Sequence, residues 1–556
     1  MPSARLPDTL YLPARAEAAI NALLGCLNQD KGCLPFCLTD LTGSPPRMAH
    51  TQFDFSDHAA RVIDALLLAR ALTGSTAGEA ELERLKGLFF DGFAEDGLHY
   101  TPENRWSFHH ANMHYQRSVL NALLALVLME NSDEAQARLA RLVGGLSDIS
   151  LRHNGFAYFP SVEYFPDGWP RGDWGILGFG VDPANTNGRL IFGLTRAWEV
   201  TGDEAARELA AAYAAHVMNH SSAYGPDGAF ATGMEFRQGH FHSRAVTMLG
   251  VIRYGHATGD QKALAWGRRV FEWARAQGTS FGWYPERLVE SRAHGAETCA
   301  IVDMMEAAIW LAKSGWPEYW EVAECILRNH LVESQLLGLD GLELSPGADD
   351  DPEWETTTDV ARRSEGGFAG WSMPNDFFSK VMHEWDLYTC CSAQGVRGLF
   401  NAWTQAVTAE AGRISVNLLI NHLSEAAVVR SWLPGAGRLE VVPFHTCEVR
   451  LRLPSWVDEA DVALTLDRLP VAGRLDAERF LSVPEVPAGA TLSINFPVAQ
   501  RREEDTILGV TYASEWHGDT VMRLSPEGVR RPLYRREAGN PARLVERDAP
   551  GISFHL

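Results

Sequence analysis

Long hydrophobic runs are absent from this chain of 556 residues. A membrane-spanning helix needs roughly 18 or more consecutive apolar residues. The longest candidate, "VLNALLALVLM", is shorter than that and is typical of a buried helix. The first residues, "MPSARLPDTLYLPARAEAA", also lack the apolar core and small-residue cleavage site of a secretory signal. We therefore expect a cytoplasmic protein with no membrane partner.

Positive charge is in deficit. The chain has 49 Lys and Arg against 71 Asp and Glu, which gives a formal net charge of −22. Nucleic acids and anionic membranes are bound through clustered Lys and Arg, so this balance argues against both as partners. A neutral partner, such as an oligosaccharide or another glycoside, fits the composition better. Whether the chain forms oligomers is left open.

Cysteine is too scarce for a disulfide framework, and a cytoplasmic setting keeps thiols reduced. The eight cysteines are Cys26, Cys33, Cys37, Cys299, Cys325, Cys390, Cys391 and Cys447. Cys325 and Cys447 lie in apolar helix and strand patterns and are expected to be inert core thiols. Cys33 and Cys37 have no further pair of metal-ligand residues beside them. Interest therefore centres on Cys299 and the tandem Cys390 and Cys391.

Helical hairpins recur over the first three quarters of the chain. Phrases such as "RAWEVTGD" and "RYGHATGD" each follow one apolar pattern of helical period and precede another. First helices are predicted to start near residues 58, 112, 187, 243, 300 and 392. Second helices are predicted at 79–90, 133–145, 203–219, 261–276 and 317–335, with an N-terminal helix at 14–28 as the sixth. Because each amphipathic hairpin needs a neighbour on both sides, we predict a closed (α/α)6 toroid over residues 1–410.

The pattern changes after residue 410. Short alternating or apolar stretches such as "CEVRLRLPSW", "DVALTLD" and "TLSINFPV" are bounded by Gly, Pro and Asp, as strands are. The predicted fold class is therefore α+β multidomain, with a toroid followed by an all-β, sandwich-like domain over residues 411–556. Two insertions without repeats, at 149–183 and 337–389, are where lids or binding loops would lie.

Polar residues precede all six predicted inner helices. In a ring of hairpins these helices run in one direction, so the residues before them face a common mouth. Helix capping accounts for Asp57, Asn185, Asn187 and Ser392, but it does not account for histidines and cysteines. We expect a functional pocket from the remaining residues, which are His58, His109, His110, Asn112, His240, His242, Glu297, Cys299, Cys390 and Cys391.

Glu297 and Cys299 cannot meet one metal ion from within a helix, because residues two apart point away from each other there. In an extended segment they share a face, and the apolar spacing predicts that the helix starts only after Cys299. Cys390 and Cys391 likewise end an extended "DLYT" approach. One carboxylate and three thiolates suit tetrahedral zinc. From the pattern alone, unlinked thiols and a closed structural zinc site both remain open.

These motifs carry a family resemblance. "AETCA" before an apolar helix, "CC" about ninety residues later, "ANTNGRLIFGLTRAWEVTGD", and "VRLRLPSWV" followed by "LSVPEVPAGATLSINFPV" resemble glycoside hydrolase family 127, the β-L-arabinofuranosidases and their relatives. The resemblance covers about residues 50 to 500. It implies a retaining exo-glycosidase that binds Zn²⁺ through Glu297, Cys299, Cys390 and Cys391. It also implies that Cys390 is the nucleophile.

The general acid departs from the family pattern. The family's glutamate lies about sixteen residues before the Glu-x-Cys motif, where this chain has Phe281. Glu286 is the nearest substitute, with Glu290 and Glu384 behind it. Aromatic residues in the insertion at 158–175, including Trp174, could stack on sugars or simply pack the loop. The expected substrate-binding residues are His109, His110, Asn185, His240, His242, Trp283, Tyr284 and Tyr388.

Two other functions stay open at this point. A lyase or sugar epimerase on the same toroid would use His240, His242 and a tyrosine as acid and base beside a structural zinc. A non-catalytic carbohydrate-binding protein would use its cysteines only to hold the rim together. The sugar, its linkage and the ring size do not follow from the sequence.

Overall fold

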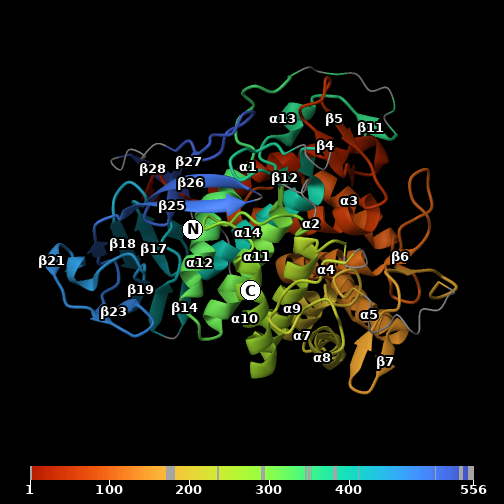
Figure 1. The fold of residues 1–556 in the computed structure, drawn as a ribbon, viewed down its shortest axis with the longest axis horizontal. Coiled ribbons are helices and arrows are strands. Elements are labelled where there is room, and N and C mark those ends of the chain that lie inside the picture. Colours follow the sequence, from red (N-terminus) through yellow and green to blue (C-terminus); the bar gives the residue numbers. More distant parts are fainter. Residues whose placement is uncertain are drawn as a thin grey trace.

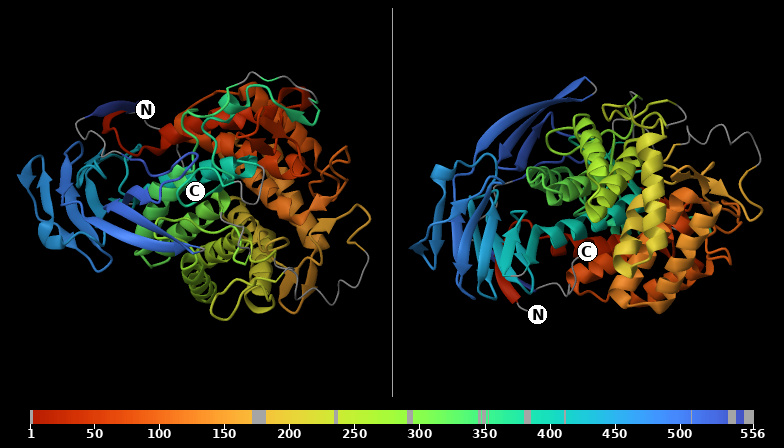
Figure 2. Two further views of the ribbon diagram at one scale, coloured as in Figure 1. Left: turned by 45° about the horizontal axis from the view of Figure 1, so that its top comes forward. Right: turned by 90° about the horizontal axis from the view of Figure 1, so that it is seen from below.

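The computed structural model describes residues 3–170, 182–233, 237–289, 295–344, 347, 351, 353–379, 385–410, 412–507, 509–536 and 543–548. Helices form one part of the molecule, and strands from the C-terminal part of the chain lie beside them (Figure 1). Two further views show the strands packed against the side of the helical part (Figure 2). Among the described residues, no helix combines the length and hydrophobicity that crossing a lipid bilayer requires.

Six inner helices form a closed ring. Each packs against the next in chain order, and the last packs against the first. They are α2 (Ala59–Thr73), α4 (Met113–Glu130), α7 (Leu190–Thr201), α9 (Phe241–Thr258), α11 (Thr298–Lys313) and α14 (Thr389–Ala406). These helices are buried on nearly every face; in α11 every residue from Thr298 to Ala312 is buried. The predicted (α/α)6 toroid is therefore confirmed.

Outer helices cover the ring, each packed on the inner helix before it in the chain. They are α3 (Glu79–Asp91), α5 (Asp133–Ile149), α8 (Glu204–Asn219), α10 (Gln261–Arg275), and α12 (Tyr319–Ile326) with the π-helical turn η4 (Leu327–Leu331). The N-terminal α1 (Leu12–Gly25) packs on both α2 and α14 and so supplies the sixth outer helix. This closure removes the exposed ends that an open array of hairpins would have.

Local capping explains the hairpin turns. After α7 the chain passes through Gly202 at φ 73°, a conformation that glycine adopts without strain, and the Asp203 side chain accepts a hydrogen bond from the Ala205 amide at the start of α8. Gly259 at φ 72° and Asp260 repeat the device between α9 and α10. The recurring Thr-Gly-Asp phrase thus encodes both the end of one helix and the start of the next.

Two main sheets follow the ring and enclose a core of their own. The five-stranded sheet has the order β14 (Val407–Glu410), β15 (Arg413–Val416), β19 (Cys447–Arg452), β23 (Phe480–Val486), β22 (Arg474–Leu475). The six-stranded sheet has the order β16 (His422–Leu423), β17 (Ala427–Ser431), β18 (Arg438–Pro443), β24 (Leu492–Asn495), β20 (Ala463–Leu466), β21 (Leu469–Pro470). Strand β14 begins directly where α14 ends.

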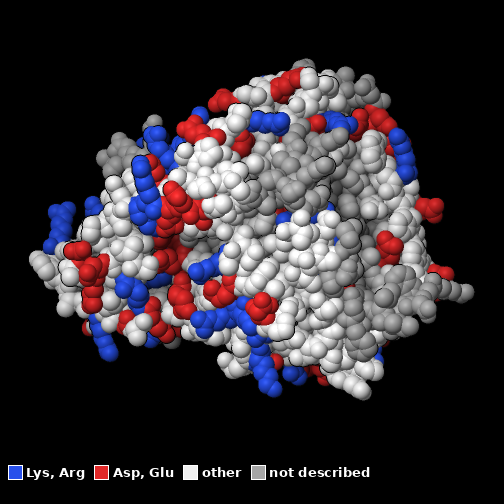
Figure 3. All heavy atoms as spheres, in the orientation of Figure 1, with Lys and Arg blue, Asp and Glu red and all other residues white. Residues whose placement is uncertain are grey.

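Further strands join the two parts of the molecule. A three-stranded sheet comprises β25 (Gln500–Ile507), β26 (Val510–His517) and β27 (Thr520–Ser525), and β1 (Ser3–Pro7) pairs with β28 (Leu544–Asp548). Charged side chains gather where the strands meet the ring (Figure 3). There Arg452 of β19 forms a buried ion pair with Glu324 of α12 and lies 3.4 Å from Glu321.

Short strands in the insertions shape the mouth of the ring. The second insertion contains, in chain order, β11 (Glu355–Thr356), the short α13 (Val360–Ser364), β12 (Trp371–Ser372) and β13 (Leu387–Tyr388). β13 pairs with β4 (Leu38–Asp40), and β4 pairs with β5 (Arg47–Ala49), which also pairs with β11. β12 pairs with β10 (Ala296–Glu297). In the first insertion, β7 (Leu151–His153) pairs with β8 (Phe156–Tyr158), and β9 (Glu163–Tyr164) pairs with β6 (Ala111–Asn112).

Candidate metal centre and active site

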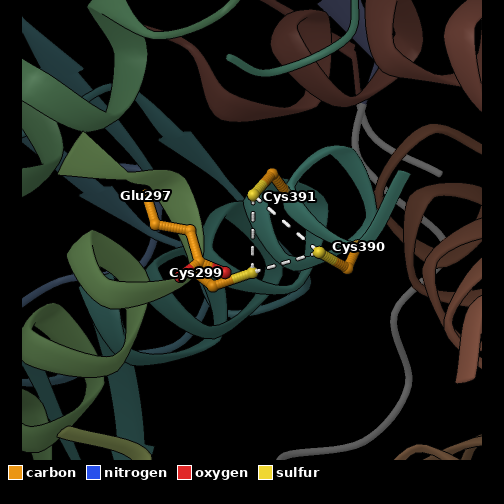
Figure 4. Close-up of side chains that lie close together, drawn as sticks. All are labelled: Glu297, Cys299, Cys390 and Cys391. Atoms are coloured by element: carbon orange, nitrogen blue, oxygen red, sulfur yellow. Dashed lines mark hydrogen bonds between the residues drawn. The ribbon is translucent and has the colours of Figure 1, made fainter. Parts of the chain in front are cut away.

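Three sulfur atoms lie at the corners of a near-equilateral triangle at the start of α11 and α14 (Figure 4). The Sγ–Sγ distances are 3.7 Å for Cys299–Cys391, 3.9 Å for Cys390–Cys391 and 4.0 Å for Cys299–Cys390. Zn–S bonds of about 2.3 Å at tetrahedral angles place sulfur atoms about 3.8 Å apart. A carboxylate oxygen of Glu297 lies within 4.8 Å of all three. The donor set therefore fits one tetrahedral zinc ion.

The local backbone explains the convergence and corrects one expectation. Glu297 is extended, with φ −74° and ψ 124°, and α11 starts directly after it, at Thr298. Cys299 is therefore in the first helical turn, not before it, and Cys390 and Cys391 are in the first turn of α14, which starts at Thr389. The predicted extended approach holds for Glu297 but was wrong for the cysteines.

Neighbouring segments hold these helix starts in place. Glu297 is opposite Trp371 in the β10–β12 pair, and the Thr298 hydroxyl donates to the Ala369 carbonyl at 2.7 Å. At the other helix, the Thr389 hydroxyl donates to the Phe36 carbonyl at 2.6 Å. Thus the second insertion and an N-terminal segment, distant in sequence, position the two halves of the ligand set.

The three thiols differ in their ease of deprotonation. Burial raises the pKa of Cys390, but hydrogen bonds from Cys299 and Cys391 and the charge of Arg61 more than offset this, and the pKa falls to about 6. Burial and the neighbouring sulfur atoms raise the pKa of Cys299 and of Cys391 well above the ordinary value. Cys299 and Cys391 are fully buried, whereas Cys390 is 5% exposed. All three sulfur atoms can be thiolates together only beside a cation, so a metal ion would suit this donor set.

His240 lies between two carboxylates. Its Nε2 atom is 3.1 Å from Glu297 Oε2 and 3.9 Å from Glu286 Oε1. Burial raises the pKa of Glu297, but the hydrogen bond and charge of His240 and the more distant charges of Arg189 and Arg237 lower it, and the net shift is downward. Glu286 is held by its backbone, whose amide donates to Gly295 and whose carbonyl accepts from Phe241. The structure therefore brings Glu286 beside His240, which also contacts the candidate metal ligand Glu297.

His242 is oriented by a buried acid. Its Nδ1 atom lies 2.6 Å from Asp303 Oδ2 of α11, and Gln394 and Arg117 approach the other oxygen of Asp303 at 3.5 and 3.8 Å. Burial lowers the pKa of His242 well below its ordinary value, and the charges of Arg189 and Arg117 add to this. Four inner helices thus contribute to one polar network beneath the mouth of the ring.

Other predicted binding residues are placed differently. Tyr388 packs beside the three cysteines and stacks on Trp371, with ring centroids 5.5 Å apart. Asn185 is at the rim, where it accepts a hydrogen bond from Arg237 at 3.3 Å. His109 is exposed and stacks on Tyr100, whereas His110 is buried against Phe108.

Two predicted aromatic residues belong to the core. Trp283 is fully buried and its indole N–H donates to the Ser372 carbonyl at 2.9 Å, and Tyr284 is 1% exposed and stacks on Phe241. In the first insertion, Phe159 is buried against Trp169 and Tyr213, which favours loop packing over an open sugar platform. Glu290, Glu384 and Trp174 lie outside the described residues.

Sequence reasoning missed several polar residues around the mouth. Burial lowers the pKa of His114, in the first turn of α4, well below its ordinary value, and the charges of Arg189, Arg237 and Arg61 lower it further. Arg61 donates to Asp57 at 2.7 Å. Arg189 is fully buried directly before α7. The sequence did contain a signal, because Arg61 and Arg189 lie close to the predicted rim residues. Their positive charges surround the site.

Comparisons with known proteins define the class of fold. No family model matches the chain, and no curated protein matches it by sequence. Among solved structures, a family GH127 β-L-arabinofuranosidase from Geobacillus stearothermophilus shares 13% identity and has a TM-score of 0.60, with 91% of this chain and 80% of that chain covered. A second GH127 β-arabinofuranosidase shares 12% identity at a TM-score of 0.59, covering 91% of this chain and 79% of that one.

Other solved structures resemble only part of this chain, as one example with a toroid shows. A cellobiose 2-epimerase from Bacillus thermoamylovorans shares 10% identity at a TM-score of 0.50, and the match covers 70% of this chain and 97% of the epimerase. The two GH127 structures match more of this chain than that toroid does. The expected resemblance to glycoside hydrolase family 127 is therefore confirmed for the fold.

Proposed function

We propose that the protein is a zinc-dependent retaining exo-glycosidase that removes a β-linked terminal sugar such as β-L-arabinofuranose. The observation that carries this proposal is the triangle of Cys299, Cys390 and Cys391 beside Glu297, at the mouth of a toroid shared with β-L-arabinofuranosidases. Glu297, Cys299, Cys390 and Cys391 would hold Zn²⁺. When bound, the ion keeps the thiols deprotonated at neutral pH.

Cys390 is the proposed nucleophile. It has the lowest pKa of the three thiols and is the only one of them with exposed surface. Its Sγ forms a bond to the anomeric carbon while the bond from that carbon to the leaving oxygen breaks, and Glu286 donates its proton to that oxygen. The product of this step is a glycosyl-thioether on Cys390.

Glu286 then acts as the base. It removes a proton from water, whose oxygen forms a bond to the anomeric carbon as the C–S bond breaks and Cys390 regains its electron pair. Each step inverts the anomeric centre, so the configuration is retained overall. His242, held by Asp303, and Tyr388, beside Cys390, are the proposed contacts to the sugar hydroxyls.

The test compares wild type, Cys390→Ser and Cys391→Ser on a panel of aryl glycosides, with bound zinc quantified in each protein. Cys447→Ser is the matched control, because that thiol is in the sandwich and half-buried. We expect wild type to release the aryl alcohol and bind one zinc, and Cys390→Ser to lose at least a thousandfold in rate. A Cys390→Ser variant with undiminished hydrolysis would overturn the proposed nucleophile.

Acid–base chemistry by His242 is the second candidate, because its 2.6 Å contact with Asp303 is the geometry of an oriented general base. Under that alternative the zinc is structural and the protein is a lyase or epimerase. An unsaturated product that absorbs in the ultraviolet, or an epimerised sugar without hydrolysis, would favour this function.

A further inference from the structure

A chain of close polar contacts runs from a buried arginine to the candidate metal ligand Glu297. Arg189 Nη2 lies 3.1 Å from Ser243 Oγ, Ser243 Oγ lies 2.7 Å from His240 Nδ1, and His240 Nε2 lies 3.1 Å from Glu297 Oε2. These residues come from the starts of three successive inner helices, α7, α9 and α11. All four are buried.

We propose that Arg189, Ser243 and His240 are positioning residues that orient the Glu297 carboxylate toward the three sulfur atoms and so set the metal affinity of the site. This inference rests on the metal centre of the proposed function. It adds a role for residues that do not contact the metal themselves, and it gives His240 a task other than binding the sugar.

The direction of each hydrogen bond follows from the chemistry of the groups. A guanidinium can only donate, so the Ser243 hydroxyl accepts from Arg189. That hydroxyl has one proton to donate, and His240 Nδ1 is the one acceptor within reach among the residues that the structure describes. A ring that accepts at Nδ1 carries its proton at Nε2. His240 therefore carries its proton on Nε2 and presents it to Glu297 Oε2 across a contact of 3.1 Å, which sets the tautomer and favours this orientation of the carboxylate.

Arg189 is anchored without a carboxylate partner. Its Nε donates to the Ala184 carbonyl at 2.6 Å, and within the described part of the chain it forms no ion pair with Asp or Glu. Burying a guanidinium without an ion-pair partner costs free energy unless a nearby polar or negatively charged group compensates the charge. Here the guanidinium is linked to the Glu297 carboxylate through Ser243 and His240. Residues that orient metal ligands in this way are typically worth about 10- to 100-fold in metal affinity.

The test measures Co²⁺ affinity by competition with a chelator, and the visible absorption of the Co²⁺ protein, in the absence of any sugar. The variants are Ser243→Ala, His240→Ala and His240→Gln, since a glutamine amide places an N–H near the position of Nε2. The matched control is Ser334→Ala, which removes a buried hydroxyl whose one side-chain hydrogen bond among the described residues is to the His330 carbonyl, four residues earlier.

We expect Ser243→Ala and His240→Ala to weaken Co²⁺ binding by about 10- to 100-fold and to shift its absorption bands. His240→Gln should recover most of the affinity, and Ser334→Ala should match wild type. If Ser243→Ala does not fold, the two His240 variants decide the question. Wild-type affinity and spectra in both alanine variants would overturn the proposed positioning role while leaving the hydrolase proposal intact. A wild-type protein that binds no Co²⁺ would overturn both.

Discussion

The sulfur atoms of Cys299 and Cys391 lie 3.7 Å apart although ninety-two positions separate them in the chain. That distance is too long for a disulfide, whose S–S bond is about 2.05 Å, and close to the edge of a zinc–thiolate tetrahedron. The pair joins the starts of α11 and α14, which are neighbours in the ring. A bound ion would therefore link two inner helices as well as support chemistry.

Metal removal should destabilise the protein. Because a ligand that binds only the folded state adds about 4 kcal/mol at a free concentration one thousand times its Kd, zinc should raise the midpoint of thermal unfolding by several degrees. The measurement is scanning fluorimetry of metal-free protein with and without added zinc. The Cys391→Ser variant should show no such rise. If zinc does not change the unfolding midpoint of the wild-type protein, the ion does not link the two helices.

Alkylation of metal-free protein should select Cys390. Its pKa of about 6, lowered from the ordinary 9.0, means that the thiolate predominates at pH 7, so its rate of reaction with iodoacetamide should fall below pH 6 and level off above pH 7. Cys299 and Cys391 should react far more slowly, because burial shields both and raises their pKa. Peptide mapping with fragmentation between residues 390 and 391 measures this. A rate that keeps rising through pH 9 would contradict the assignment.

Loss of the Glu286 carboxyl should slow hydrolysis according to the leaving group. Glu286→Gln should lower kcat/KM about 10²- to 10⁴-fold for an alkyl glycoside, which needs protonation, and less for an activated aryl glycoside. Added azide should restore turnover of the aryl substrate by replacing the activated water. Glu103→Gln, at an exposed position, is the control. Equal losses on both substrates without rescue by azide would point to another acid.

Glu306 should make the stability of the ring depend on pH. Burial raises its pKa from 4.5 to about 7, against the opposing charges of Arg397, Arg117 and Arg196. Between these two values the folded state binds more protons than the unfolded state, so the free energy of unfolding falls as pH rises.

Glu306→Gln should remove this dependence. The variant should resemble wild type near pH 4.5 and exceed it by up to about 3 kcal/mol at pH 8. Thermal unfolding of both proteins across this range provides the measurement. A difference that is the same at every pH would show that Glu306 does not titrate in the folded protein.

Much of the ring was predictable because its signals are local. The inner helices start at residues 59, 113, 190, 241, 298 and 389, against predicted starts near 58, 112, 187, 243, 300 and 392. The two cysteine-bearing helices, α11 and α14, both start two to three residues earlier than predicted. There Thr298 and Thr389 anchor the first turn through contacts with Ala369 and Phe36, which are distant in sequence.

The roles of the aromatic residues were harder to predict. Trp283 and Tyr284 stand next to the candidate acid in sequence, yet both are buried in the core. A motif indicates which residues are near each other along the chain, but not which side of the backbone faces the mouth. Trp371, by contrast, lies in an insertion and is brought opposite Glu297 only by the pairing of β10 with β12.

The sequence by itself determined the helical hairpins, their closure into a toroid and the chemical types of the four candidate metal ligands. Periodicity, capping and residue identity are properties of short segments, so they can be recognised in the sequence before the fold is known. Only the tertiary structure decided that Arg189, Ser243 and His240 connect to Glu297, and that Glu286 lies within 4 Å of the same histidine. Such distances depend on how three helix starts pack together, and no single segment contains that information.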